Sequence, residues 1–277
     1  MRCRLFILYL LAAAIPHANS KVYDCFLFLN EVEVLDIRLH EMAPVVDKFV
    51  IVEAIETFRG NPKELVFAKF ADSFKEFADK IIYIPIDHHF ESECAWRREK
   101  YHRNMIIKGL EECEENDVIL ISDVDEIVSA KSVKEIVVAL RGKQNLVVAV
   151  NQKLHSFFLN RVPDGALWRG TVATSFNKLK RLTCDGTRLL RYDVPGVGNG
   201  WHFTNQGGLE RYLYKLGAYS HSEWDTPEYK EAKREESPVW RTSSVPVDES
   251  FPLYIRENQS YFEEIGFLLR CPSIDQQ

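Results

Sequence analysis

Apolar and polar positions along the chain fall into two alternating patterns. Short, almost continuously apolar runs predict strands buried on both faces, whereas apolar residues at intervals of three and four predict helices. The runs that predict strands are 22–29, 49–52, 81–86, 118–122 and 146–150. Helical spacing covers 32–42, 68–78, 94–113, 132–140 and 209–216. This alternation predicts an α/β fold, in which helices cover both faces of a mostly parallel, Rossmann-type sheet.

The second half of the chain is less regular. Residues 195–202 contain Gly196, Gly198 and Gly200, and we interpret them as a loop whose backbone can approach a ligand closely. Residues 225–249 are charged and rich in Pro and Ser, which indicates a surface segment without a second core. A chain of 277 residues that is 46% apolar can form one large core, so we expect one domain over 21–277.

The first twenty residues have the composition of a secretory signal peptide. Arg2 and Arg4 precede an apolar run over 5–15, and Ala18-Asn19-Ser20 fits a small-x-small cleavage site. That run is short against the ~20 residues that cross a bilayer, so we expect cleavage and no stable membrane span, with a retained anchor as the alternative. The mature protein would reside in the lumen of the secretory pathway (Golgi or ER) or be secreted. The sequon at Asn258 agrees with this route.

Charge and cysteine content exclude some classes of protein. Without Arg2 and Arg4 the chain has 33 basic and 41 acidic residues, a net charge of −8, and it has no long basic run. Nucleic acid is therefore not an expected partner. Outside the leader the five cysteines are an odd count with no Cys-x-x-Cys pair, so the sequence does not determine any disulfide pairing.

Three acids follow the apolar run 118–122. Asp123, Asp125 and Glu126 come directly after this expected strand, and ligands of open parallel sheets bind beyond the carboxyl ends of strands. Two carboxylates at i and i+2 of an extended chain point the same way and suit Mn²⁺ or Mg²⁺ bound to a substrate diphosphate. One alternative is a set of loop acids in which Glu126 favours the start of the next helix through its macrodipole. Another is a phosphatase with a phosphorylated Asp, for which no later paired-acid motif is present.

Several ordered motifs together resemble glycosyltransferase family 17, over about residues 22–270. They include Ile-Ser-Asp-Val-Asp-Glu-Ile at 121–127, Gly-Trp-His at 200–202 and Ser-His-Ser-Glu at 220–223, besides 23–31, 46–53, 57–60 and 103–104. The resemblance implies a GT-A-like fold and an inverting, metal-dependent transfer of GlcNAc from UDP-GlcNAc. The implied acceptor is a glycan or glycoprotein, with β-1,4 linkage to the β-linked core mannose of N-glycans. A different acceptor and a catalytically silent glycan-binding protein are the alternatives.

The expected metal ligands are Asp123, Asp125 and His202, the last because a late histidine commonly completes the metal site of GT-A enzymes. The alternative for His202 is a packed core histidine beside Trp201. Asp123 is also expected to face the donor. Trp168 and Trp201 are either core residues or platforms for a sugar ring. A general base on the acceptor hydroxyl is usually a carboxylate in an inverting transfer, and we slightly favour Glu223 over Asp225.

Other candidates for donor binding are Asn30, Glu53, Arg103, Asn104 and Lys215. Asn30 and Glu53 end the first two expected strands, where Rossmann-like folds read a ribose or base. Arg103 shares an apolar helical stripe with Ile107 and Leu110, so it needs an anionic partner, either a structural acid or the diphosphate with the clustered acids. Lys215 is a candidate contact to the diphosphate.

Overall fold

The computed structural model describes residues 20–163, 167–238 and 244–270. Residues 1–19 of the expected leader and Cys271 lie outside this range. No helix within it is long and apolar enough to cross a membrane. The cysteines within it are free thiols, namely Cys25, Cys94, Cys113 and Cys184.

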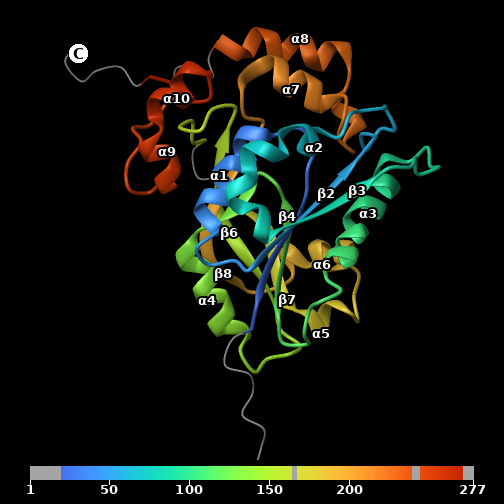
Figure 1. Cartoon of the computed structure of the whole chain (residues 1–277). Helices are drawn as coiled ribbons and strands as arrows, with labels where there is room; N and C mark the ends of the chain where they lie inside the picture. The colour runs from blue at the N-terminus through green and yellow to red at the C-terminus, as the bar shows by residue number, and fades with distance from the viewer. Residues whose placement is uncertain (1–19, 164–166, 239–243, 271–277) are drawn as a thin grey trace, which may run out of the picture.

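The described residues form one α/β domain around a mixed sheet of eight strands (Figure 1). The strand order is β3-β2-β1-β4-β7-β6-β8-β5. Pairs β2·β3, β1·β2, β1·β4 and β6·β8 are parallel, while β4·β7, β6·β7 and β5·β8 are antiparallel. The strands are β1 (Val22–Leu27), β2 (Lys48–Ala54), β3 (Ile81–Ile86), β4 (Val118–Asp123), β5 (Glu126–Val128), β6 (Val147–Ser156), β7 (Leu167–Ser175) and β8 (Gly196–Thr204).

Helices cover both faces of the sheet, as expected from the sequence (Figure 1). The α-helices are α1 (Val32–Met42), α2 (Val66–Phe70), α3 (Ala95–Asn104), α4 (Ala130–Leu140), α5 (Phe176–Leu179), α6 (Cys184–Leu189), α7 (Gly208–Leu216), α8 (Pro227–Glu236), α9 (Leu253–Glu257) and α10 (Gln259–Glu264). The 3₁₀ helices are η1 (Ala71–Lys80), η2 (Met105–Gly109), η3 (Leu190–Tyr192) and η4 (Ser222–Trp224).

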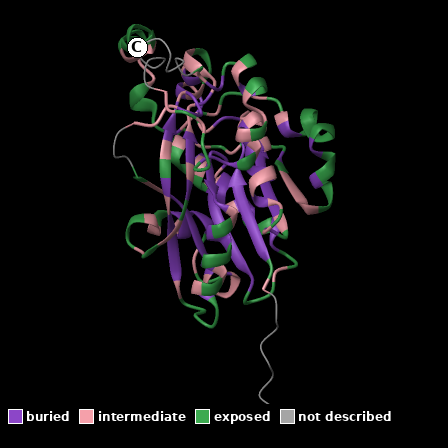
Figure 2. Cartoon of the chain, turned by 90° about the vertical axis from the view of Figure 1, so that its left-hand side faces the viewer, coloured by how far each residue is buried: buried purple, intermediate pink, exposed green. Residues whose placement is uncertain are grey.

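The two cores follow from the two-residue period of the strands. In β4, Val118 and Leu120 pack with α1 and α4 on one face, whereas Ile119 and Ile121 pack with η2 and α6 on the other. Both faces are therefore buried, and Figure 2 shows the strands as the buried centre of the molecule. This explains why the strands read as continuous apolar runs instead of alternating ones.

The expected elements are confirmed in the first half and corrected in the second. Helix α1 spans the predicted residues, and the predicted helix 94–113 is α3 followed by the 3₁₀ helix η2. Residues 195–202, expected to form a loop, largely belong to strand β8. Its glycines allow close backbone packing against β5, because a Cβ at Gly200 would lie 2.2 Å from the carbonyl oxygen of Ile127.

A buried arginine joins α1 to the end of β4. The guanidinium of Arg38 donates to both carboxylate oxygens of Asp24, at 2.6 and 2.7 Å, and both side chains are fully buried. It also donates to the hydroxyl of Ser122 at 2.6 Å. Its remaining donors bond the carbonyl oxygens of Asp123, Val124 and Glu126 at 2.9–3.1 Å. Arg38 therefore holds the turn that carries the three clustered acids.

Replacing Arg38 should destabilise the fold strongly. In Arg38→Met the carboxylate of Asp24 remains buried without its cation, which typically costs about 3–5 kcal/mol. Urea unfolding of this variant measures the loss. Arg211→Met is the control, because Arg211 forms an exposed pair with Glu33 whose removal should cost only about 0–1 kcal/mol. An equal loss in both variants would contradict the role assigned to Arg38.

Candidate active site

A cavity of about 650 Å³ opens at the carboxyl ends of the parallel strands. The register places Leu27 of β1 opposite both Val52 of β2 and Asp123 of β4, so these three strands end at one edge. The turn after β4 therefore meets the segments that follow β1 and β2. Charged residues that line the cavity include Glu31, Arg103, Asp123, Asp125, Arg188 and Lys215. Their position agrees with the general location of ligand sites in open α/β sheets.

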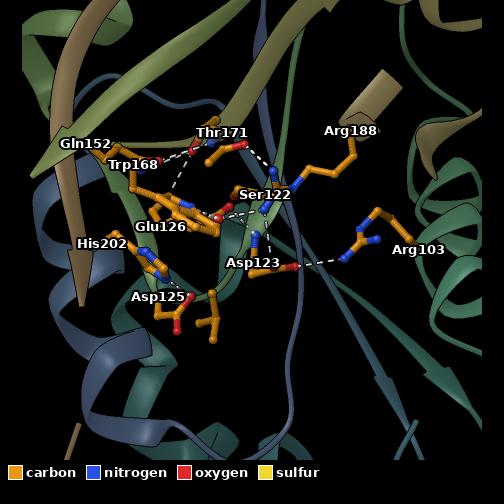
Figure 3. A network of polar contacts seen from close by, with 12 residues as sticks. Arg103, Ser122, Asp123, Asp125, Glu126, Gln152, Trp168, Thr171, Arg188 and His202 are labelled. Atoms are coloured by element: carbon orange, nitrogen blue, oxygen red, sulfur yellow. Dashed lines mark hydrogen bonds and ion pairs between the residues drawn. The ribbon is translucent and has the colours of Figure 1, made fainter. Parts of the chain in front are cut away.

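Asp123 lies between two arginines (Figure 3). Its Oδ1 accepts from Nη2 of Arg103 at 3.0 Å, and its Oδ2 accepts from Nη2 of Arg188 at 3.2 Å. Burial acts to raise the pKa of Asp123, but the two arginines outweigh it and lower the pKa to about 2. The side chain is still 41% exposed, so the carboxylate is ionised and accessible from the cavity.

Asp125 is more deeply buried and has different partners. Its Oδ2 accepts from Nζ of Lys215 at 3.0 Å, and its Oδ1 lies 3.5 Å from Nε2 of His202. Burial would raise the pKa of Asp125, yet Lys215 and His202 hold that pKa well below its usual range. Burial likewise opposes the charge on Lys215, but Asp125 and Glu31 outweigh it and raise the pKa of Lys215. The structure thus brings Asp125, His202 and Lys215 together.

Glu126 accepts hydrogen bonds from other residues of the site and does not start a helix. It is the first residue of β5, whereas α4 begins after Ser129, whose hydroxyl caps it. The Oε1 of Glu126 accepts from Nε1 of Trp168 at 2.7 Å and from Arg188 at 2.6 Å. Its Oε2 accepts the backbone N–H of Asp123 at 3.0 Å (Figure 3). The macrodipole interpretation of Glu126 is therefore wrong, and Trp168 has a structural bond besides lining the cavity.

Arg103 pairs with structural acids and with one of the clustered acids, while a contact to a diphosphate stays a prediction. Besides Asp123, it donates to Glu99 at 2.7 Å and to Asp185 at 3.0 Å. Asn104 points instead to the backbone, because its Oδ1 accepts the N–H of Asp185 at 3.0 Å. Arg103 lines the cavity, and Asn104 holds the start of α6 against α3.

The acids and amides at the ends of β1 and β2 have separate environments. Glu53 accepts four hydrogen bonds from its own chain, from Lys63, the N–H groups of Val66 and Phe67, and the hydroxyl of Tyr83. Its carboxylate therefore fastens Lys63 and the start of α2 and has no oxygen left for a ribose. Asn30 lies in a small pocket beside Asp125 and Lys215. Its neighbour Glu31 lies 3.6 Å from Lys215 and accepts the N–H groups of Leu29 and Asn30.

The two candidate bases lie away from the clustered acids. Asp225 is paired with Arg59 at 2.8 Å and with Lys230 at 2.5 Å. Glu223 is 55% exposed and accepts from Nδ1 of His221 at 2.7 Å. His221 is one of the described residues that line the cavity, whereas Glu223 and Asp225 do not line it. Trp201 likewise faces away, since its Nε1 donates to the carbonyl of Ser250.

Sequence reasoning did not identify Arg38, Asp185 or Arg188. All three are buried charged residues, and Asp185 and Arg188 pair with charges more than 60 residues away in the chain, whereas Arg38 pairs with Asp24 of the preceding strand. The sequence did show that Arg188 belongs to the basic segment 178–191. Composition alone could not connect this segment to Asp123. Gly170 was a second signal, because a Cβ there would lie 2.4 Å from Glu126 and would leave no room for its carboxylate.

The donor atoms present fit part of a metal site. No group of three or more His, Cys, Asp or Glu side chains is poised for a metal within 20–163, 167–238 and 244–270. Asp125 and His202 nevertheless offer a carboxylate oxygen and an imidazole nitrogen 3.5 Å apart, a separation compatible with two neighbouring ligands of one ion. A hard divalent cation commonly takes one or two protein ligands and completes its coordination with phosphate oxygens and water. The residues therefore fit a metal that arrives with a diphosphate.

Comparison with known proteins places the chain in a family of sugar-transferring enzymes. The family model for glycosyltransferase family 17 matches residues 10–259, and the chain belongs to that family. Two similar proteins are the β-1,4-mannosyl-glycoprotein 4-β-N-acetylglucosaminyltransferases of human and rat, each 25% identical over 200 residues. The match covers 69% of this chain and 37% of each relative, so the chain aligns with well under half of their length.

Solved structures give more distant likenesses. GalNAc-T7 with UDP, GalNAc and Mn²⁺ has 13% identity and a TM-score of 0.45, covering 90% of this chain and 55% of that one. A 2-C-methyl-D-erythritol 4-phosphate cytidylyltransferase of Francisella tularensis has 12% identity and a TM-score of 0.38, covering 65% and 90%. These scores are too low to argue about function, so the α/β class rests on the sheet itself.

Acid should test the charge balance around Asp123. Its folded-state pKa of about 2 lies below the ordinary value of 3.8, so ionised Asp123 stabilises the fold above about pH 4, and this stabilisation is lost as the pH falls toward 2. We expect the free energy of unfolding of the wild type to fall more steeply between pH 4 and 2 than that of Asp123→Asn. Urea unfolding at several pH values measures both slopes. Parallel slopes would mean that the arginines do not stabilise the Asp123 carboxylate.

Proposed function

We propose that this member of family 17 transfers GlcNAc from UDP-GlcNAc to a glycan with inversion at the anomeric carbon. The observation that carries the proposal is the cavity at the strand ends, which Asp123, Asp125 and Lys215 line and where His202 lies 3.5 Å from Asp125. The proposed acceptor is the β-linked core mannose of N-glycans, forming a β-1,4 linkage. The human and rat relatives are β-1,4-mannosyl-glycoprotein 4-β-N-acetylglucosaminyltransferases, which supports this choice of donor and acceptor.

The donor diphosphate would bind where acids and cations alternate. Asp125 and His202 would hold Mn²⁺ or Mg²⁺, and the imidazole favours Mn²⁺, because Mg²⁺ is bound mainly through oxygen. Such an ion neutralises negative charge on a departing nucleoside diphosphate. Asp123, accessible from the cavity, is the second carboxylate for the metal and donor. Its arginines remain beside it, and Arg103 adds fixed positive charge next to the diphosphate.

Lys215 provides a positive charge in the same place. It comes from α7, and its ammonium donates to Asp125 at 3.0 Å. A diphosphate that enters the cavity offers the ammonium a second anionic partner at the same depth. The lysine therefore belongs to the donor site in this proposal, together with Asn30 on the neighbouring pocket wall. The buried bonds of Glu53 and Asn104 assign those two residues to support of the site.

Removing the carboxylate of Asp125 should abolish metal-dependent donor binding. Asn supplies one neutral oxygen where Asp supplies an anionic pair, so Asp125→Asn should lose Mn²⁺-dependent UDP affinity and GlcNAc transfer together, each by at least about 10²-fold. Isothermal titration with UDP and Mn²⁺, and UDP release from UDP-GlcNAc, measure the two effects.

Asp87→Asn is the matched control, because Asp87 is exposed and bonds only a neighbouring histidine among the described residues. Thermal unfolding checks that both variants remain folded. Normal turnover of Asp125→Asn, or wild-type activity that survives complete chelation by EDTA, would refute the metal site.

The proposed location of the enzyme is the lumen of the secretory pathway or the extracellular space. The basic start, the short apolar run and the small residues before Lys21 support it. Expression in a secreting eukaryotic cell should give a product whose N-terminal sequence begins at or near Lys21. A membrane-bound product that retains Met1 would point to an anchor instead.

A further inference from the structure

A second group of side chains lines the same cavity apart from the clustered acids. Trp96, at the start of α3, lines it with 50% of its surface exposed. His221, in the segment between α7 and α8, lines it as well, and the two rings stand almost perpendicular at 84° with centroids 4.6 Å apart. Large exposed aromatic faces at a cavity are costly in water and are a common means of binding the apolar faces of ligands.

His221 is held in one orientation by Glu223. The ring Nδ1 and the carboxylate Oε1 are 2.7 Å apart, so Nδ1–H donates and Nε2 carries the free lone pair. Within the described chain no residue hydrogen-bonds Nε2, and the side chain is half-exposed. Because Glu223 does not line the cavity while His221 does, the imidazole is the group of this pair that a ligand in the cavity would meet.

Three contacts hold the segment 217–225 to its surroundings. Ser220 donates from Oγ to the carbonyl of Ala95 at 3.5 Å, next to Trp96. Asn61 donates to the carbonyl of Gly217 at 3.3 Å, and Arg59 pairs with Asp225 at 2.8 Å. Residues from two other parts of the chain therefore hold this segment beside α3. A positioned base requires such support, because rate depends on the geometry of the proton transfer.

We propose that Trp96, His221 and Glu223 form the acceptor-sugar subsite, in which Trp96 stacks on the sugar ring and His221 is the catalytic base. This inference rests on the proposed transfer reaction and replaces the carboxylate base expected from the sequence. Glu223 is a positioning residue that sets the tautomer of His221 and stabilises the imidazolium once it forms.

The transfer step balances with His221 as the proton acceptor. The acceptor hydroxyl oxygen forms a bond to the anomeric carbon of GlcNAc, while the bond from that carbon to the β-phosphate oxygen breaks and its electron pair leaves with UDP. The hydroxyl proton moves to Nε2 of His221, and the carboxylate of Glu223 then faces a cation. Water takes this proton from the imidazolium after product leaves.

Three variants separate binding from proton transfer. The probes are UDP with Mn²⁺ for donor binding, and an N-glycan that contains the β-linked core mannose as acceptor. Trp96→Ala should raise the KM for the glycan about 10-fold and leave UDP affinity unchanged, because stacking contributes to acceptor binding. His221→Gly should lower kcat by about 10²–10⁴-fold, and free imidazole should restore part of it. Glu223→Gln should lower kcat about 10-fold with the KM unchanged, since an amide still accepts from Nδ1 but carries no charge.

Matched controls come from another exposed aromatic residue and another exposed histidine. Phe70→Ala removes a comparably exposed aromatic ring on α2, and His88→Gly removes an exposed histidine that bonds Tyr101; neither lines the cavity among the described residues. Both should keep wild-type kcat and KM, and imidazole should have no effect on His88→Gly.

The kinetic and binding results can each overturn the subsite. Weaker UDP binding in Trp96→Ala would show that the ring stacks on the nucleobase, and normal kcat in His221→Gly would exclude it as the base. A wild type that binds UDP with Mn²⁺ but does not modify the N-glycan would refute the proposed acceptor alone. In that case glycan-array binding decides: loss of wild-type binding in Trp96→Ala supports the subsite, and unchanged or absent binding overturns it.

Discussion

The buried ion pair between Arg38 and Asp24 determines where the chemistry of this fold can occur. Asp24 lies in the central strand β1 and Arg38 in the helix that follows it, so the pair forms early in the chain and within the core. The guanidinium then uses its other donors on three carbonyl oxygens of the turn after β4. The backbone of this turn is thereby held where Asp123 and Asp125 line the cavity.

Charge compensation is the second constraint on the site. Asp123, Asp125 and Glu126 follow one another closely, and their mutual repulsion would be severe in a partly buried turn without cations. Arg103, Arg188 and Lys215 supply that compensation from three different helices. The same arrangement is useful for binding a diphosphate, because the cations already lie beside its proposed position. The same three cations can thus balance the charge of the acids before a diphosphate binds and the charge of its phosphates afterwards.

The sequence predicted the first half of the fold well, because local and global preferences agree there. Continuous apolar runs marked β1, β2 and β4, since each of these strands is buried on both faces, and also the partly buried edge strand β3. Strand β8 was missed because Gly196, Gly198 and Gly200 normally indicate a loop. The structure shows that glycine is needed at position 200 for contact between two backbones. A single sequence gives no means of distinguishing close approach to a ligand from close approach to another strand.

Some residues of the candidate site could likewise be predicted from the sequence and others could not. Asp123, Asp125, Arg103 and Lys215 were identified from the sequence, and the structure places them around one cavity. His202, expected from the family resemblance, lies 3.5 Å from Asp125. Arg188 reaches the site only through tertiary packing of α6. The choice between Glu223 and its neighbour His221 shows the limit most clearly. Both residue types can accept a proton, and their spacing of two residues cannot tell which one faces the ligand. The 3₁₀ turn η4 decides it, since it leaves the histidine in the cavity wall and turns the carboxylate outward behind the ring. At such a segment the residue types determine which chemistry is possible, and the backbone geometry determines which side chain faces the cavity.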